Sequence, residues 1–180
     1  KEILFSQPKS PKGSNPSTII ENIFFDGNAR NNKINYGWVI NMAIGLHGGK
    51  DSTIRNNHFV DMPNETIVGH GVIVDNNNFD GLNGSAFHTS VHDNTLQING
   101  LASFTNNTVN DVNRIDKYLS GHSEGAITFS WGGGNLNIEN NYFSSETGNY
   151  GVMGIFAGQP QNTDENLIMT GNEAYNFEWI

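Results

Sequence analysis

Ile54-Arg-Asn-Asn-His-Phe59 and Val74-Asp-Asn-Asn-Asn-Phe79 are two copies of one short motif, in which two asparagines stand between flanking hydrophobic residues. The other copies are Phe104-Thr-Asn-Asn-Thr-Val109, Ile138-Glu-Asn-Asn-Tyr-Phe143, and the frayed Ile20-Glu-Asn-Ile-Phe-Phe25 and Met169-Thr-Gly-Asn-Glu-Ala174. The six copies start at residues 20, 54, 74, 104, 138 and 169, so their spacing is irregular. A motif that recurs roughly every twenty to thirty-five residues is typical of repeat architectures.

The asparagine motif predicts a short strand that ends in a sharp corner. Each copy is too short for a helix, and its apolar positions do not recur at the helical period. Asparagine suits a corner because it tolerates left-handed backbone angles and its side chain can bond to nearby backbone. If each copy lies one coil above the preceding one, the side-chain amides can bond to each other across one strand spacing of about 4.8 Å. This asparagine ladder would consist of Asn57, Asn77, Asn107, Asn141 and Asn172.

The repeat therefore predicts an all-β fold, a parallel β-helix, in which the first apolar residue of each copy points into the core. We expect short strands at residues 53–55, 73–74, 103–105 and 137–139, and almost no helix. A second type of strand precedes the motif in most repeats. Its copies are Ala43-Ile-Gly-Leu46, Thr66-Ile-Val68, Ser85-Ala-Phe87, Ala126-Ile-Thr-Phe129 and Val152-Met-Gly-Ile-Phe156.

Aligning these strands places a row of residues at one level of the predicted sheet. The row consists of His47, His70, His88, Ser130 and Ala157. A slip of one residue in this alignment would send the row to the opposite face. A further motif-like stretch, Val91-His-Asp-Asn-Thr-Leu96, starts too close to Phe104 for a full coil, so we expect it to be the third strand of the same coil.

Composition limits the classes of function. The chain has 180 residues, which is enough to bury a core, and it combines 15% charged residues with a net charge of −9. The acidic balance argues against nucleic acid as a partner, because phosphate binding needs clustered Lys and Arg. The absence of cysteine excludes disulfides and thiolate zinc sites. No run approaches the roughly 18 apolar residues of a membrane span.

We divide the chain into two parts. Residues 1–17 form a lead-in strand and a proline-rich loop, because proline cannot donate a hydrogen bond within a sheet. Residues 18–180 form the β-helix domain. No capping helix precedes the first coil, so we expect the chain to be part of a longer protein.

On these features the chain resembles the right-handed parallel β-helix superfamily, which includes pectate-lyase-like and other polysaccharide-active proteins. The asparagine motifs, the strands before them and the opening Ile23-Phe-Phe-Asp-Gly-Asn28 carry the resemblance over about residues 18–177. It implies a right-handed solenoid of about six coils in a secreted or cell-surface protein. The fold hosts lyases, glycoside hydrolases, epimerases, tailspikes and adhesins, so the resemblance implies a class of substrate and not a reaction.

The densest group of ionisable residues lies between Asn110 and Glu124. Glu124 and His122 stand two apart where this segment re-enters a strand, so both can face one side and serve general acid–base catalysis. The alternative is a solvated loop edge.

Arg114, Lys117 and Tyr118 fit the needs of a polysaccharide lyase. A cation neutralises the uronate carboxylate, which acidifies the proton at C5, and a Lys, Arg or Tyr takes or returns that proton. The alternative is a set of loop salt bridges with Asp111 and Asp116. We therefore name Arg114, Lys117, His122 and Glu124 as candidate catalytic residues and Tyr118 as a candidate substrate-binding residue.

Three further residues are candidates for substrate binding. Trp131 precedes three glycines, and an indole beside a surface cleared of side chains suits packing against a sugar ring. His88 and His92 could flank a cleft, with Asp93 orienting one imidazole. The alternatives are a Trp that packs in the core or a loop, and histidines that stack and bond to their neighbours.

No cofactor and no metal site are expected. Asp26, Asp75 and Asp80 could bind calcium through oxygen ligands, but no Asp-x-Asp-x-Asp-Gly loop is present, which favours turn residues.

The leading hypothesis is a lyase or glycoside hydrolase that acts on an extended polysaccharide, such as one containing uronic acid. The alternative is a non-catalytic adhesin, tailspike-like or carbohydrate-binding module. Polysaccharide is the expected partner in both cases, with neither nucleic acid nor membrane. The sequence leaves open the polysaccharide, the reaction and the oligomeric state.

Overall fold

The computed structural model describes residues 5–6, 17–28, 43–46, 52–62, 66–69, 71–82, 84–90, 101–112, 126–130, 135–145, 153–155 and 166–176. Every regular element within these residues is a β-strand. In chain order the strands are β1 (Phe5–Ser6), β2 (Ile19–Glu21), β3 (Phe24–Asp26), β4 (Ile44–Leu46), β5 (Thr53–Arg55), β6 (His58–Val60), β7 (Ile67–Gly69), β8 (Ile73–Asp75), β9 (Asn78–Leu82), β10 (Phe87–Ser90), β11 (Leu101–Thr105), β12 (Thr108–Val112), β13 (Ile127–Ser130), β14 (Asn135–Glu139), β15 (Tyr142–Ser144), β16 (Met153–Ile155), β17 (Asn166–Thr170) and β18 (Glu173–Tyr175).

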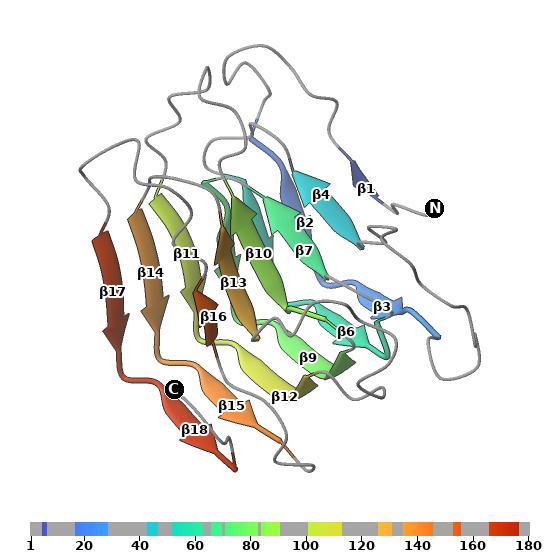
Figure 1. Cartoon of the computed structure of the whole chain (residues 1–180). Helices are drawn as coiled ribbons and strands as arrows, with labels where there is room; N and C mark the ends of the chain where they lie inside the picture. Colours follow the sequence, from blue (N-terminus) through green and yellow to red (C-terminus); the bar gives the residue numbers. More distant parts are fainter. Residues whose placement is uncertain are drawn as a thin grey trace.

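The strands form three parallel six-stranded sheets, which the chain visits in turn (Figure 1). Sheet A has the order β1-β4-β7-β10-β13-β16, sheet B has β2-β5-β8-β11-β14-β17, and sheet C has β3-β6-β9-β12-β15-β18. Each strand therefore pairs with the strand three places further along the chain. This confirms the all-β, parallel prediction and is compatible with a β-helix. The strands expected at 53–55, 73–74, 103–105 and 137–139 are confirmed within β5, β8, β11 and β14.

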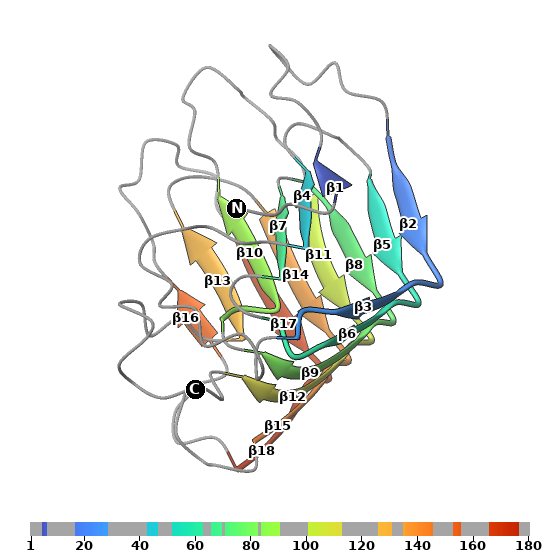
Figure 2. The ribbon, with the colours of Figure 1, turned by 90° about the vertical axis from the view of Figure 1, so that its right-hand side faces the viewer.

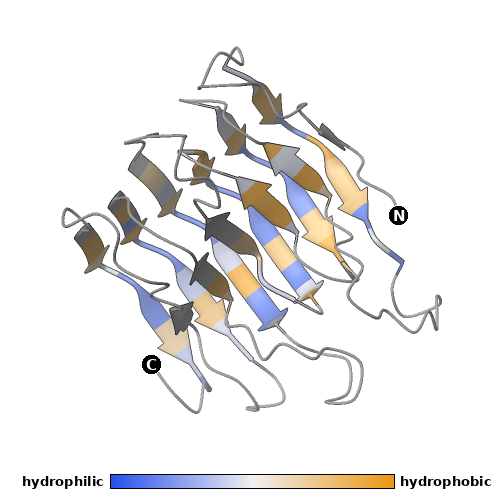
Figure 3. Cartoon of the chain, turned by 45° about the horizontal axis from the view of Figure 1, so that its top comes forward, coloured by the Kyte–Doolittle hydropathy of each residue, from blue (hydrophilic) through white to orange (hydrophobic). Residues whose placement is uncertain are grey.

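The core consists of apolar residues that stack from one strand to the next. Phe25, Phe59 and Phe79 occupy equivalent positions on sheet C, and their ring centroids lie 4.6 and 5.0 Å apart in nearly parallel planes. Phe104 of sheet B continues the aromatic column, at 5.8 Å from Phe79 and 6.4 Å from Phe143. Figure 3 shows the apolar and polar residues alternating as bands along the strands. Burying one such side chain stabilises the fold by about 1.5–3 kcal/mol.

Sheets B and C meet along one edge of the molecule, where the two central residues of each motif form the corner (Figure 2). The first of these two residues has a left-handed backbone, with φ between 52° and 60° at the asparagines and 64° at Gly171. The residues at this first position are Asn22, Asn56, Asn76, Asn106, Asn140 and Gly171. The left-handed backbone costs most residues about 1–2 kcal/mol, whereas asparagine and glycine adopt it readily. The asparagine side chains at this first position are exposed, and one of them also joins two repeats, since Asn76 Nδ2 donates to Asn56 Oδ1 at 2.7 Å.

The second asparagine of each pair is buried and bonds to the next repeat. Asn57 Nδ2 donates to Asn77 Oδ1 at 3.1 Å, and the same oxygen accepts the Asn57 backbone N–H at 3.0 Å. Asn77 Nδ2 repeats this bond to Asn107 Oδ1 at 3.1 Å and also donates to the carbonyl of Ile54 at 2.9 Å. Equivalent amide–amide bonds join Asn107 to Asn141 at 3.2 Å and Asn141 to Asn172 at 2.9 Å.

The amides of Asn57, Asn107 and Asn141 therefore each have three partners, and that of Asn77 has four, because it also donates to the carbonyl of Asp75 at 3.1 Å. Burying a polar group without partners is costly, whereas a fully satisfied buried network fixes one arrangement. In the first repeat Ile23 takes the place of the second asparagine, and its backbone N–H donates to Asn57 Oδ1 at 3.0 Å. The row of side-chain bonds thus begins at Asn57.

Candidate functional site

Most of the sequence-predicted site residues lie outside the residues that the structure describes. Arg114, Lys117, Tyr118, His122 and Glu124 fall between β12 and β13. His92 follows β10, and Trp131 follows β13 directly. Their roles stay predictions, as does the strand expected at 91–96. His88 is described through its backbone, which lies in β10.

The register of β10 corrects the predicted row of residues on sheet A. His88 pairs with Val68 and Thr128, while Ser90 pairs with Ser130. The prediction that His88 lies level with Ser130 is therefore wrong by two positions. The alignment treats Phe87 as the end of its strand, whereas Phe87 is the first residue of β10. The buried small residues Ser85 and Ala86 before it do not belong to the strand.

The connections that enter or leave sheet A hold all the length variation of the repeats. Every connection from sheet B to sheet C contains only the two central residues of the motif. By contrast, residues 27–43, 61–66, 83–86 and 113–126 connect sheet C to the next strand of sheet A. In repeat proteins, insertions of variable length map to one face, which is often the binding face.

The predicted site residues cluster in sequence around one pair of strands in this sheet. β10 and β13 are hydrogen-bonded neighbours, and the candidates lie within these two strands or in the connections next to them. Glu124 precedes β13 whereas Trp131 follows it, so the strand separates their chain positions. At about 3.3 Å per residue, the two ends of this four-residue strand lie roughly 10 Å apart.

The outer side of sheet A is covered at β4 and β7. Val68 is only 7% exposed although it does not belong to the core cluster, and Gly45, with which it pairs, is also buried. On the inner side of β7, a Cβ atom at Gly69 would lie 2.6 Å from Cγ2 of the core residue Val72, so glycine suits this position.

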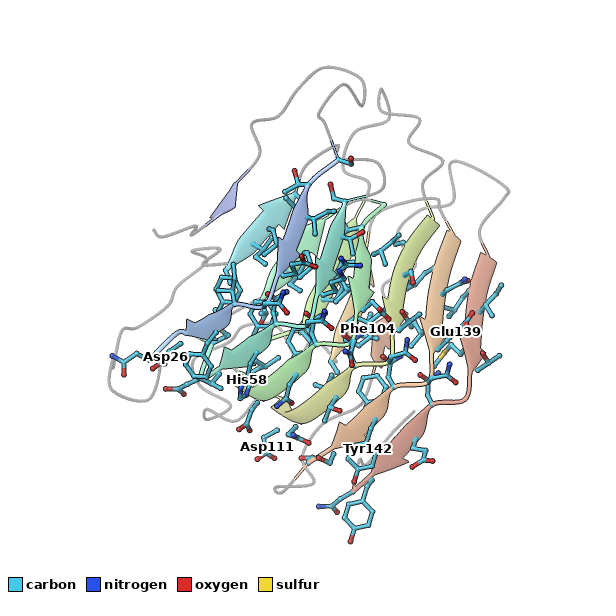
Figure 4. All side chains as sticks on the ribbon, turned by 180° about the vertical axis from the view of Figure 1, so that it is seen from behind. Asp26, His58, Phe104, Asp111, Glu139 and Tyr142 are labelled. Atoms are coloured by element: carbon cyan, nitrogen blue, oxygen red, sulfur yellow. The ribbon has the colours of Figure 1, made fainter. Side chains whose placement is uncertain are left out.

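Sheet B carries a row of polar side chains that the sequence analysis did not single out. The row runs through Glu21, Arg55, Asp75, Thr105 and Glu139 at equivalent positions beside the corner. Arg55 Nε donates to Glu21 Oε2 at 2.7 Å. Asp75 Oδ1 accepts from Thr105 Oγ1 at 2.7 Å and from Asn106 Nδ2 at 2.8 Å. Among the described residues, no side-chain partner is found for Glu139, which Figure 4 labels on β14.

Asp75 and Glu139 lie two strands apart, a backbone separation of roughly 9.6 Å at the usual strand spacing. Paired carboxyl groups about 6.5–9.5 Å apart are found in inverting glycosidases, but an acid catalyst also needs a carboxyl group held out of water. Both side chains are partly exposed, and Asp75 already accepts two hydrogen bonds. The pair therefore suits hydrogen bonding to ligand hydroxyl groups better than it suits acid catalysis.

Sheet C carries aromatic residues along one outward row. Phe24 is 61% exposed, and its ring meets that of His58 edge-on with centroids 5.2 Å apart. Four strands beyond Phe24 in the same row, Tyr142 is 42% exposed (Figure 4). Asn78 and Thr108 occupy the positions between His58 and Tyr142. Phe24 and Tyr142 thus present exposed aromatic rings at the two ends of the row, and such rings can pack against sugar rings.

The described residues contain no group of three or more His, Asp or Glu side chains that could hold a metal ion. Within the same residues, no helix has the length and apolar character needed to span a membrane. None of the protein-family models, curated proteins or solved structures compared with the chain matches it.

Proposed function

We propose that the chain is a right-handed parallel β-helix of about six coils, which its asparagine ladder holds in register. We further propose that this β-helix binds and processes an extended polysaccharide outside the cell. The observation that carries this proposal is that the connections of sheet A hold the length variation of the repeats, and that the ionisable candidates gather in one of them, between β12 and β13. A rigid sheet with variable connections along one side can hold an extended polymer and place ionisable groups against it.

In this proposal, Arg114 and Lys117 neutralise the acidic groups of the polymer, and His122 and Glu124 exchange protons with it. Tyr118, Trp131, His88 and His92 contact the sugar rings. The chemistry is either β-elimination at a uronate or hydrolysis of a glycosidic bond. No cofactor is required for either reaction in this proposal.

The test is incubation with a panel of uronate, sulfated and neutral polysaccharides. Ultraviolet absorbance of an unsaturated product together with new reducing ends identifies a lyase, and reducing ends alone identify a hydrolase. The proposal expects Glu124→Gln or Lys117→Ala to remove at least about 2.7 kcal/mol of transition-state stabilisation, roughly a hundredfold in rate. Glu21→Gln, at the first strand of sheet B, is the matched control and should leave turnover unchanged. Wild-type rates in both site variants would refute this assignment.

The exposed aromatic row on sheet C favours a second candidate, a module that binds polysaccharide without processing it. In that case polysaccharides would retard the protein in affinity electrophoresis without any product being released. Tyr142→Ala should then weaken binding about tenfold, whereas Thr108→Ser in the same row should not.

A further inference from the structure

The corners between sheets B and C differ from one another in the residue that follows each corner on the outer side of sheet C. This residue stands two places after the first corner residue and begins a strand of sheet C. In chain order these residues are Phe24, His58, Asn78, Thr108, Tyr142 and Glu173. The fourth corner alone combines an asparagine at the first position with an aliphatic hydroxyl group at this outer position.

The fourth corner therefore contains the sequence Asn106-Asn107-Thr108. Asparagine followed two residues later by serine or threonine is the acceptor sequence for N-linked glycans in exported proteins. Two further sequences of this type begin at Asn64 and Asn83, which lie outside the described residues. The structure thus decides whether a glycan fits at Asn106.

The buried asparagines of the corners are excluded as acceptors. They are at most 3% exposed, and their amides bond to adjacent repeats. The residue two places after each of them lies in the core and is apolar, so none has the required hydroxyl group. These pairs are Asn57 and Phe59, Asn77 and Phe79, Asn107 and Val109, and Asn141 and Phe143. The motif therefore restricts glycan attachment to the exposed first position of a corner.

The side chain of Asn106 has room for a substituent. It is exposed, and it belongs to the corner that forms one edge of the molecule (Figure 2). Its Nδ2 donates to Asp75 Oδ1 at 2.8 Å. A primary amide has two N–H donors, so this bond uses one of them and leaves the other for substitution. Asp75 Oδ1 also accepts from Thr105 Oγ1 at 2.7 Å, so this carboxylate keeps a partner whether or not Asn106 is modified.

We propose that Asn106 is an acceptor site for an N-linked glycan. The donor is an oligosaccharide joined to a lipid through pyrophosphate. Nδ2 forms a bond to the anomeric carbon of the first sugar, the bond from that carbon to the pyrophosphate oxygen breaks, and Nδ2 gives up one proton as the lipid pyrophosphate leaves. The product is a secondary amide, whose remaining N–H can still donate to Asp75. This proposal rests on the export included in the proposed function, but not on any activity on polysaccharides.

The test is secretion of the full chain from eukaryotic cells, which supply this donor. Peptide mass spectrometry should find a glycan on Asn106 in most molecules, and peptide N-glycosidase should remove it and leave an aspartate at position 106. Chymotrypsin separates this site from Asn64 and Asn83, because phenylalanines lie between the three sites. Finding position 106 unmodified in the secreted protein overturns the proposal, whatever the state of the other two sites.

Two substitutions of Thr108 form a matched pair. Thr108→Val removes the hydroxyl group and keeps the branched shape of the side chain, so the glycan at Asn106 should be lost. Thr108→Ser keeps the hydroxyl group and should retain the glycan. Asn106→Gly, which suits the left-handed backbone at φ 55°, should also abolish the modification without unfolding the chain. Equal occupancy in the valine and serine variants would contradict the assignment.

The corner at Asn76 offers a gain of the same modification. Asn76 is exposed with φ 52°, and its Nδ2 also donates to a single acceptor, Asn56 Oδ1. Among the described residues, Asn78 Oδ1 is buried without a hydrogen-bond partner, so replacing it costs the fold little. Asn78→Thr should therefore add a glycan at Asn76. Its absence would show that an exposed corner asparagine does not accept a glycan, which would remove the structural basis of the proposal.

Discussion

The corner between sheets B and C is built in the same way in each repeat, whereas the connections to sheet A differ from one repeat to the next. Two residues make the corner: the first has a left-handed backbone, and the second, in every repeat but the first, has its side-chain amide bonded to an adjacent repeat. An extra residue there would reverse the alternation of every following side chain. The connections to sheet A take no part in these amide bonds, so their length and composition are free to vary.

The largest effect is expected from adding one residue to the corner. An alanine inserted between Asn106 and Asn107 should destabilise the protein by at least about 3 kcal/mol, because several buried hydrogen bonds are lost together. A glycine inserted between Ser120 and Gly121, in the connection from β12 to β13, should cost less than about 1 kcal/mol, because loop-closure entropy changes slowly with length. Urea unfolding of both variants checks this contrast, and equal losses would contradict it.

The next largest loss of stability is expected from replacing the buried asparagine of a corner, and it should exceed the loss from replacing the exposed asparagine beside it. Asn107→Ala removes the acceptor for both donors of Asn77 and the donor to the carbonyl of Val74, all of them buried. The expected loss is about 3 kcal/mol in the free energy of unfolding, since each unsatisfied buried group costs roughly 1–3 kcal/mol. Urea unfolding measures this loss, and a loss below about 1 kcal/mol would mean that the buried row does not hold the repeats together.

Asn106→Ala, one residue earlier, should cost only about 1–2 kcal/mol. Its side chain is exposed, so the loss comes from the left-handed backbone at φ 55° and from the hydrogen bond to Asp75. Asn106→Gly relieves the backbone cost and should recover most of the difference. A glycine variant that is no more stable than the alanine variant would show that the backbone angle is not the cause.

The smallest effect is expected from the ion pair on the outer side of sheet B. Glu21 and Arg55 are 38% and 46% exposed, and exposed pairs contribute about 0–1 kcal/mol. Arg55→Ala should therefore change the melting temperature little, and the difference should shrink further at high salt. A large, salt-independent loss would indicate that Arg55 stabilises the fold through packing instead.

The repeated motif made most of the strand arrangement predictable from the sequence. Asparagine pairs flanked by apolar residues mark where β5, β8, β11 and β14 end, because the same side-chain requirements recur in each repeat. The register of β10 was not predictable in this way. The small residues Ser85 and Ala86 resemble strand residues in the sequence although they precede the strand.

The candidate site was less predictable than the fold for a physical reason. The residues proposed for chemistry lie in connections where no repeated pattern constrains the backbone, so sequence spacing says little about distances there. The contact of Asp75 with Thr105 was also missed, because it joins residues 30 positions apart on the outer side of sheet B. Only the register of the strands brings these two side chains together.

The most direct test of the account is hydrogen exchange of the asparagine side-chain amides, followed by nuclear magnetic resonance. The Nδ2 groups of Asn77, Asn107 and Asn141 are buried and bonded to neighbouring repeats, so they should exchange many times more slowly than those of the exposed Asn56 and Asn140. Protection of the buried set alone is the predicted result. Equally fast exchange in both sets would contradict the claim that buried asparagine amides hold the repeats in register.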